Sequence, residues 1–151
     1  MGAFVIQLDR QYTNGQQFSL QINFSTETGG NDGVLFLSPS QTWGGEQPMM
    51  ITNSQYIFGR MIVPQQDTPS NRITWGQCIT AYQNLTAWCS GDLTGVYQTY
   101  AGMYKTCYYN KVPLPNFLMN TLVGEFDIQY IEPTLLEIAP SFIIAEPSFM
   151  P

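Results

Sequence analysis

The sequence predicts a mainly β protein, an antiparallel sandwich or barrel with one or two short helices and an extended C-terminal arm. Short runs of alternating apolar and polar residues recur along the chain, and Gly- or Asn-containing turn signals separate them. The end of the chain differs, because it carries a proline at every seventh residue. We therefore divide the chain into a β-rich body, residues 1–131, and a proline-punctuated arm, residues 132–151.

Two strands are predicted close to the N-terminus. Residues 18–24 alternate strictly between apolar and polar side chains, and residues 4–8 do the same. A two-residue Asn-Gly turn would send the two apolar faces to opposite sides of the sheet, which the pairing register does not allow. We therefore expect a hairpin with a three-residue loop, residues 13–15, in which Gly15 adopts a left-handed bulge.

The next part of the chain predicts short strands separated by polar loops. Residues 34–37 form an apolar run that Pro39 ends, and a long loop with Trp43 at its centre follows. Two further strands are expected over residues 49–52 and 56–63.

One segment predicts a helix. Between residues 77 and 89 the apolar positions follow a helical period, and Ser90-Gly91 provides a stop. Residues 96–109 are rich in Tyr and Thr, which favours strands turning at Gly102 over a helix that would have to include two glycines.

The body ends with a short helix and a strand. Residues 115–123 predict the helix, which Gly124 closes. Residues 126–130 then alternate between apolar and acidic or polar side chains, and the arm leaves from this final strand.

The composition is poor in charge. Charged residues make up 11% of the chain, against about 25% in typical soluble domains, and neutral polar residues replace them. Neutral polar groups lose less free energy on desolvation than charges do, so this surface suits a protein that packs against neighbours. The few basic residues are scattered, which argues against nucleic-acid binding. No apolar run approaches the length of a membrane span, and the N-terminus lacks the pattern of a secretory signal.

No catalytic motif is present. The chain has no histidine, which removes the usual general base and the commonest transition-metal ligand. We therefore expect a protein that is not an enzyme and that holds no cofactor or metal. Cys78, Cys89 and Cys107 lack a CxxC spacing, so buried free thiols are expected, with one disulfide as the alternative.

Two other functions stay open. Trp43 lies beside two glycines, and together with Trp75, Trp88 and nine tyrosines it is compatible with a carbohydrate-binding β-sandwich, although tryptophans more often serve a core or an interface. Paired carboxylates in the body leave a glycosidase as a third hypothesis.

The arm is the strongest functional signal. Prolines at this spacing exclude a helix, and the many apolar side chains require a surface to cover them. Burying side chains does not by itself offset the entropy of ordering the arm, so we expect it to add as an edge strand to a sheet. An arm that reaches about 60 Å favours a neighbouring subunit over its own body. The expected partner-binding residues are Pro133, Leu135, Leu136, Ile138, Pro140, Phe142, Ile143, Ile144, Pro147, Phe149 and Met150.

A compact β body followed by such an arm, residues 126–151, resembles small viral structural proteins, most of all the capsid decoration (cement) proteins of tailed bacteriophages. The resemblance implies a virion protein of the capsid surface, made in the host cytoplasm. It would stabilise the shell as a homo-oligomer, a homotrimer in that family, through subunit arm exchange and contact with the major capsid protein. A carbohydrate-binding module of a phage tail or surface protein is the alternative.

Overall fold

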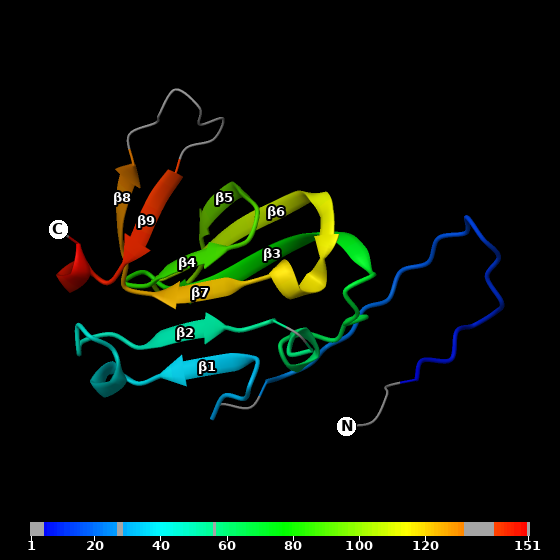
Figure 1. Cartoon of the computed structure of the whole chain (residues 1–151), viewed down its shortest axis with the longest axis horizontal. Helices are drawn as coiled ribbons and strands as arrows, with labels where there is room; N and C mark the ends of the chain where they lie inside the picture. The colour runs from blue at the N-terminus through cyan, green and yellow to red at the C-terminus, as the bar shows by residue number, and fades with distance from the viewer. Residues whose placement is uncertain (1–4, 27–28, 56, 132–140, 151) are drawn as a thin grey trace.

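The computed structural model describes residues 5–26, 29–55, 57–131 and 141–150. Its strands form a four-stranded sheet, a three-stranded sheet and a two-stranded hairpin, and every ladder is antiparallel (Figure 1). The first sheet has the order β1 (Val34–Leu37), β2 (Met49–Thr52), β7 (Thr121–Gly124), β4 (Thr86–Cys89). The second has the order β3 (Arg72–Tyr82), β6 (Met103–Pro115), β5 (Asp92–Gln98), and the hairpin pairs β8 (Asp127–Ile131) with β9 (Ser141–Ala145).

Helical structure is limited to single 3-10 turns in the described part of the chain. These turns are η1 (Pro39–Gln41), η2 (Gly59–Met61), η3 (Asn116–Leu118) and η4 (Pro147–Phe149). None of the helices described is long and apolar enough to cross a membrane. The predicted fold class, mainly β with antiparallel sheets and a few short helices, is confirmed.

Several predicted strands are found at or near their expected positions. β1 and β2 have the predicted bounds, and β8 begins one residue later than expected. The Tyr- and Thr-rich segment forms β5 and β6, which turn at Gly102 with a left-handed φ of +70°. Glycine adopts this conformation without the steric cost that a side chain would add.

The predicted helix over residues 77–89 is wrong. Residues 77–82 continue β3, and β4 follows after a short turn in which Leu85 N donates to the Tyr82 carbonyl. The apolar positions fit a helical period, but they belong to two strands that pair with different neighbours, β3 with β6 and β4 with β7. Tertiary pairing overrides the local pattern here.

Two other elements differ from expectation. Residues 56–63 form no strand among their described members and instead contain the turn η2. The segment 115–123 holds only the single turn η3 before it becomes β7. In both places the chain is tied by side chains to another loop, as described below.

The expected N-terminal hairpin is present only at its turn. Gly15 has a φ of +89°, and Gln16 N donates to the Thr13 carbonyl at 3.1 Å. Residues 5–8 and 18–24 do not pair with one another in the described chain, so the predicted ladder is wrong. Figure 1 shows this segment as a long loop that extends away from the sheets.

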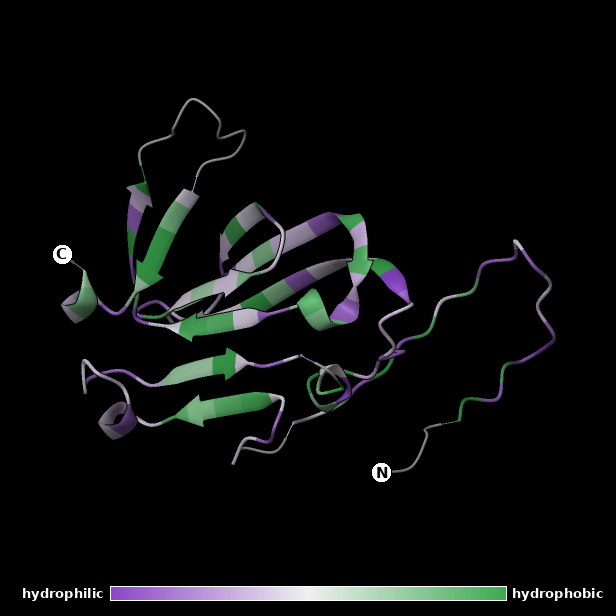
Figure 2. Cartoon of the chain, viewed as in Figure 1, coloured by the Kyte–Doolittle hydropathy of each residue, from purple (hydrophilic) through white to green (hydrophobic). Residues whose placement is uncertain are grey.

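A small apolar core lies between the two larger sheets. Hydrogen bonds link them at one edge: Trp75 Nε1 donates to the Ser90 carbonyl at 3.3 Å, and Tyr108 Oη donates to the Ala87 carbonyl at 3.1 Å. Hydrophobic residues are concentrated on β1, β7 and β9 (Figure 2). The buried apolar residues are Val34, Met49, Trp75, Ala87, Cys107, Tyr108, Met119 and Val123.

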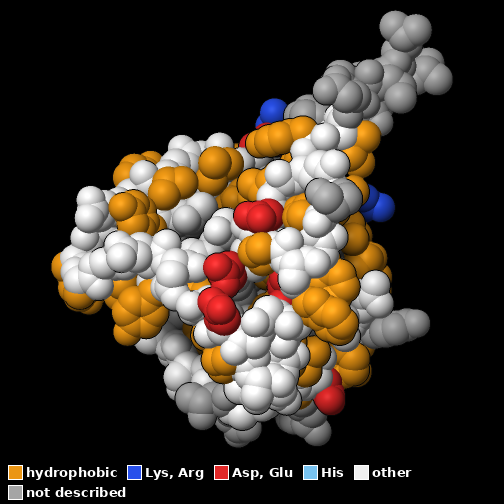
Figure 3. Space-filling model, turned by 90° about the vertical axis from the view of Figure 1, so that its left-hand side faces the viewer, with side chains coloured by type: hydrophobic (Ala, Val, Ile, Leu, Met, Phe, Trp, Pro, Cys, Tyr) orange, Lys and Arg blue, Asp and Glu red, His pale blue; other side chains and the backbone are white. Residues whose placement is uncertain are grey.

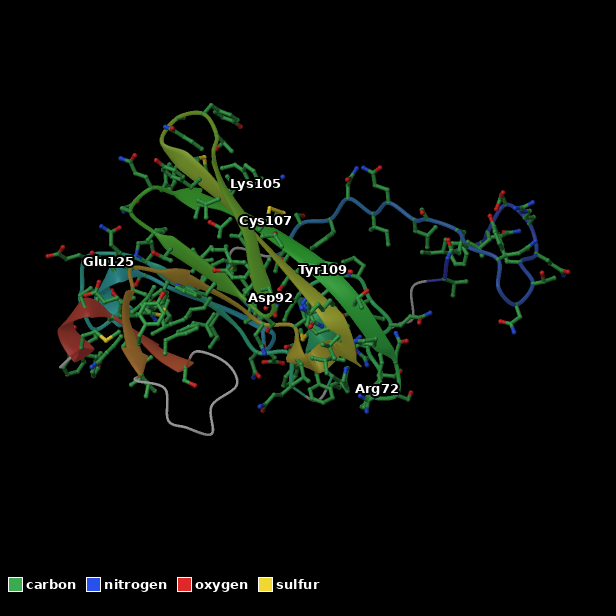
Figure 4. The ribbon with its side chains drawn as sticks, turned by 90° about the horizontal axis from the view of Figure 1, so that it is seen from above. Arg72, Asp92, Lys105, Cys107, Tyr109 and Glu125 are labelled. Atoms are coloured by element: carbon green, nitrogen blue, oxygen red, sulfur yellow. A yellow bond between two sulfur atoms is a disulfide. The ribbon has the colours of Figure 1, made fainter. Side chains whose placement is uncertain are left out.

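A disulfide joins Cys78 of β3 to Cys107 of β6, and these residues are directly opposite in the ladder. Cys107 lies between Lys105 and Tyr109 on β6 (Figure 4). Cys89 is the free cysteine. The expectation of free thiols is therefore wrong for two of the three, because cross-strand pairing brings together side chains that are 29 residues apart in sequence.

Reducing the Cys78–Cys107 disulfide should lower the free energy of unfolding by about 3–4 kcal/mol, because the bond closes a long loop in the unfolded chain. Urea unfolding with and without a reductant measures the difference. The variant Cys89→Ser is the control and should lose the same amount. An unchanged unfolding curve after reduction would contradict the prediction.

Candidate functional site

The loop between β2 and β3, residues 53–71, is held by buried polar contacts. The fully buried Ser54 hydroxyl lies 2.8 Å from the Phe117 carbonyl, 2.9 Å from the Met119 carbonyl and 2.8 Å from Asn120 Oδ1. One hydroxyl proton thus faces three acceptors. The start of the loop is fastened in this way to the connection between η3 and β7.

An ion pair closes the same loop further along. The Asp67 carboxylate, whose side chain is 3% exposed, accepts hydrogen bonds from the backbone N and from Nε of Arg60, each at 3.0 Å. Arg60 Nη2 also donates to the Asp67 carbonyl at 3.1 Å. A Cβ at Gly59 would displace the end of the Gln65 side chain and press on the Asp67 carboxylate. These bonds hold η2 against the second half of the loop.

Three amide atoms in the loop and in the adjoining η3 lack partners among the described residues. Gln65 Nε2, Gln65 Oε1 and Asn116 Oδ1 are buried and make no hydrogen bond there. Asn116 is almost fully buried and donates through Nδ2 to the Gln66 carbonyl at 2.6 Å. Such amides can bind neutral hydrogen-bonding groups, but they supply neither a nucleophile nor a general base.

A second polar cluster crosses the core. Gln77 Nε2 donates to Thr121 Oγ1 at 3.1 Å, and that hydroxyl in turn donates to Cys89 Sγ at 3.8 Å. Burial raises the pKa of Cys89, and the Thr121 hydroxyl lowers it only in part. The pKa of Tyr108 is raised by burial and by the nearby Cys89 charge. Cys89 is therefore a neutral thiol at neutral pH and not an activated nucleophile.

The described half of the predicted arm lies on its own body. In β9, Phe142, Ile143 and Ile144 pair with Tyr130, Gln129 and Ile128 of β8. A strand that pairs with the nearest upstream edge closes a shorter loop than one that reaches a distant sheet. Of the other predicted partner-binding residues, Pro147 begins η4, Phe149 ends it and Met150 follows it. The rest lie outside the described residues: Pro133, Leu135, Leu136, Ile138 and Pro140.

Aromatic contacts fasten this C-terminal segment. The Phe142 ring lies 5.4 Å from Trp88, and the Phe149 ring lies 4.9 Å from Trp43. The Gly44 backbone N donates to Glu146 Oε2 at 2.6 Å. Figure 3 looks onto this end of the molecule and shows acidic side chains gathered between apolar ones. Partner binding by the predicted arm residues stays a prediction.

The tryptophans do not form a sugar platform. Trp75 is buried in the core, and Trp88 packs between Tyr108 and Phe142. Trp43 is exposed, but its ring packs against Phe149 in a tilted arrangement.

The fold is a β domain of antiparallel sheets, tied together by buried polar contacts and by aromatic contacts of its C-terminal segment. Residues 2–118 match the family of the Peptidase M1 N-terminal domain, and the chain belongs to that family.

Curated relatives and solved structures agree with this family. The chain is 27% identical over 131 residues to aminopeptidase B of Mus musculus, covering 82% of this chain and 19% of that protein. It is 26% identical over 132 residues to leukotriene A-4 hydrolase of Xenopus laevis, covering 85% of this chain and 21% of that protein. The structure of yeast LTA4 hydrolase in complex with bestatin matches with a TM-score of 0.63 and 25% identity, covering 82% of this chain and 17% of that chain. The chain thus spans about a fifth of the length of the curated relatives that it matches.

The family overturns the phage interpretation. The relatives are cellular peptidases, so the resemblance to capsid decoration proteins is wrong. The expectations that came with it are wrong too: the virion location, the homotrimer, the major capsid protein as partner and the alternative carbohydrate-binding module. The expectation that the protein is not an enzyme is contradicted as well, because the matched family and relatives are peptidases. The apolar C-terminal residues misled the interpretation because a strand that covers its own body has the same composition as one that covers a neighbour.

The described residues of this chain do not assemble a site for zinc, the metal of one solved structural neighbour, the M1 zinc metallopeptidase from Deinococcus radiodurans. The chain has no histidine. The described residues bring together no group of three or more His, Cys, Asp or Glu side chains that could hold a metal ion. Two of the three cysteines are in the disulfide.

Sequence reasoning missed the polar contacts of the β2–β3 loop. Ser54, Arg60 and Asp67 lie within one loop and Asn116 lies in η3, and their sequence spacing contains no recognised motif. The available signal was Asp67-Thr68-Pro69, a combination typical of turns. It predicts a loop, but it does not predict which side chains bind that loop to the rest of the domain.

The variant Asp67→Ala should lower the free energy of unfolding by about 1.5–3 kcal/mol, because it removes a buried charged acceptor from the backbone N and from Nε of the half-exposed Arg60. Urea unfolding followed by tryptophan fluorescence measures the loss. Asp92→Ala is the matched control. Asp92 and Lys111 form an exposed ion pair at 3.7 Å, and losing this pair should lower the free energy of unfolding by less than about 0.5 kcal/mol. Equal losses in the two variants would contradict the importance of the Arg60–Asp67 pair.

Stability should fall as the pH rises above about 8.5, the ordinary pKa of a thiol. The raised pKa of Cys89 and Tyr108 means that the folded chain keeps protons that the unfolded chain releases. Their contribution is therefore complete below the unfolded pKa and is lost as pH rises towards the folded pKa. Urea unfolding between pH 7 and about pH 10 measures this, and Cys89→Ser should flatten the curve. A wild-type stability that is constant across this range would refute the prediction.

Proposed function

We propose that this chain is the N-terminal β domain of an M1-type aminopeptidase. The match of residues 2–118 to the family carries the proposal, and the structural similarity to yeast LTA4 hydrolase over most of the chain supports it. Two of the matched relatives are aminopeptidase B of Mus musculus and leucine aminopeptidase 2 of Aspergillus terreus, the latter 33% identical over 104 residues (66% of this chain and 16% of that protein).

The role of this domain is structural and not chemical. The chain has no histidine, its free thiol is held neutral by burial, and its described residues assemble no metal site. Peptide-bond hydrolysis therefore depends on residues outside this chain. The domain contributes a rigid β scaffold and the β2–β3 loop. Ser54 and the Arg60–Asp67 pair hold the backbone of that loop in one conformation.

The surface of the domain suits this role. Many large apolar side chains stay exposed, among them Ile57 on the β2–β3 loop and Leu35 and Phe36 on β1. Single exposed apolar residues are ordinary, but a small core with this much exposed apolar surface is typical of a domain that packs against other parts of an enzyme.

Protein immunopurified from its natural source with an antibody against this chain should hydrolyse aminoacyl-coumarin substrates. Bestatin, which the yeast relative binds, should inhibit that activity. The recombinant 151-residue chain is the matched control and should show no hydrolysis with or without added zinc. Immunopurified protein without bestatin-sensitive hydrolysis would overturn the proposal.

A further inference from the structure

Residues 5–26, the N-terminal segment, are a long described stretch without a strand partner. Their one backbone–backbone hydrogen bond among the described residues is the turn between Gln16 N and the Thr13 carbonyl. The rest of the segment runs extended and leads into β1 (Figure 1). Outside the turn at residues 13–16, its described N–H and C=O groups are therefore available to pair with another strand.

The second half of the segment has the side-chain pattern of a half-buried strand. Four large apolar side chains occupy alternate positions and are between 39% and 53% exposed, whereas a strand with a covered face would bury them. Polar residues occupy the positions between them. The apolar residues are Phe18, Leu20, Ile22 and Phe24, and the polar ones are Ser19, Gln21 and Asn23.

The segment also lacks the features that protect a free strand. Residues 11–26 contain no charged residue and no proline. Edge strands that remain free usually carry lysine, proline or a bulge, which discourage pairing with other chains. An uncharged, alternating strand without them is suited to being paired.

We propose that residues 18–24 form a β-strand that pairs with an uncharged, extended strand of the same peptidase polypeptide, outside the 151 residues of this chain. The inference rests on the proposed function. The family match begins at residue 2 and includes the segment, which places it within the domain and not in an appended tail. The curated relatives are about five times longer than the matched region, so such a polypeptide has sequence from which to supply the strand.

The partner strand follows from the chemistry of the segment. Its backbone would satisfy the free N–H and C=O groups of residues 18–24, and alternating apolar side chains on the partner would cover the exposed face. A charged partner strand is disfavoured, because the segment offers no opposite charge to compensate for desolvation.

Hydrogen–deuterium exchange tests the proposal on the protein immunopurified from its source, with the recombinant 151-residue chain as reference. The amides of residues 18–24 should exchange about 100-fold more slowly in the native protein than in the recombinant chain. Aminopeptidase activity together with equal exchange rates would overturn the strand pairing and leave the proposed function intact. Absence of the activity would overturn the proposed function and this inference with it.

A pair of variants in the native polypeptide sharpens the test. Leu20→Lys places a charge on the apolar face and should abolish the protection, whereas Gln21→Lys places the same charge on the polar face and should preserve it. In the recombinant 151-residue chain both variants should unfold at the same urea concentration as wild type, because the segment is unpaired there. Protection that survives Leu20→Lys would contradict the pairing.

Discussion

The two larger sheets meet at Thr121, and the rest of the structure depends on this buried contact. Its backbone N donates to Thr52 Oγ1 at 2.7 Å, and the Thr52 hydroxyl donates back to the Thr121 carbonyl at 3.1 Å. Its own hydroxyl accepts from Gln77 and faces Cys89. One threonine thus joins β2, β3, β4 and β7. Because the apolar core is small, buried hydrogen bonds of this kind have a large effect on which packing is adopted.

The buried contact at Thr121 also explains why the β2–β3 loop is held in place. The loop leaves β2 beside Thr52, and Ser54 binds the connection that leads into β7. The ends of the loop are therefore fixed by the sheets, and the Arg60–Asp67 pair fixes its middle. A loop held at three points by buried polar groups presents its exposed residues in one arrangement, which is what a supporting domain of a larger enzyme requires.

The strands that could be predicted are those whose pattern is local. β1 and β2 are short apolar runs between turn residues, and β8 alternates over five residues. The helix over 77–89 failed because its apolar spacing arises from two strands in different sheets. Little of the candidate site was predictable, because Ser54, Asp67 and Asn116 act through partners that lie 7 to 66 residues away in the sequence.

By itself, the sequence determined the β class and the scarcity of charge, since these follow from composition and from alternation over a few residues. Only the tertiary structure decided that Phe142 and Phe149 cover their own body, that Cys78 meets Cys107, and that the apolar residues of 18–24 stay exposed. The reason is physical: an apolar strand is compatible with any open sheet edge or face, and which one it covers depends on the chain geometry that brings them together.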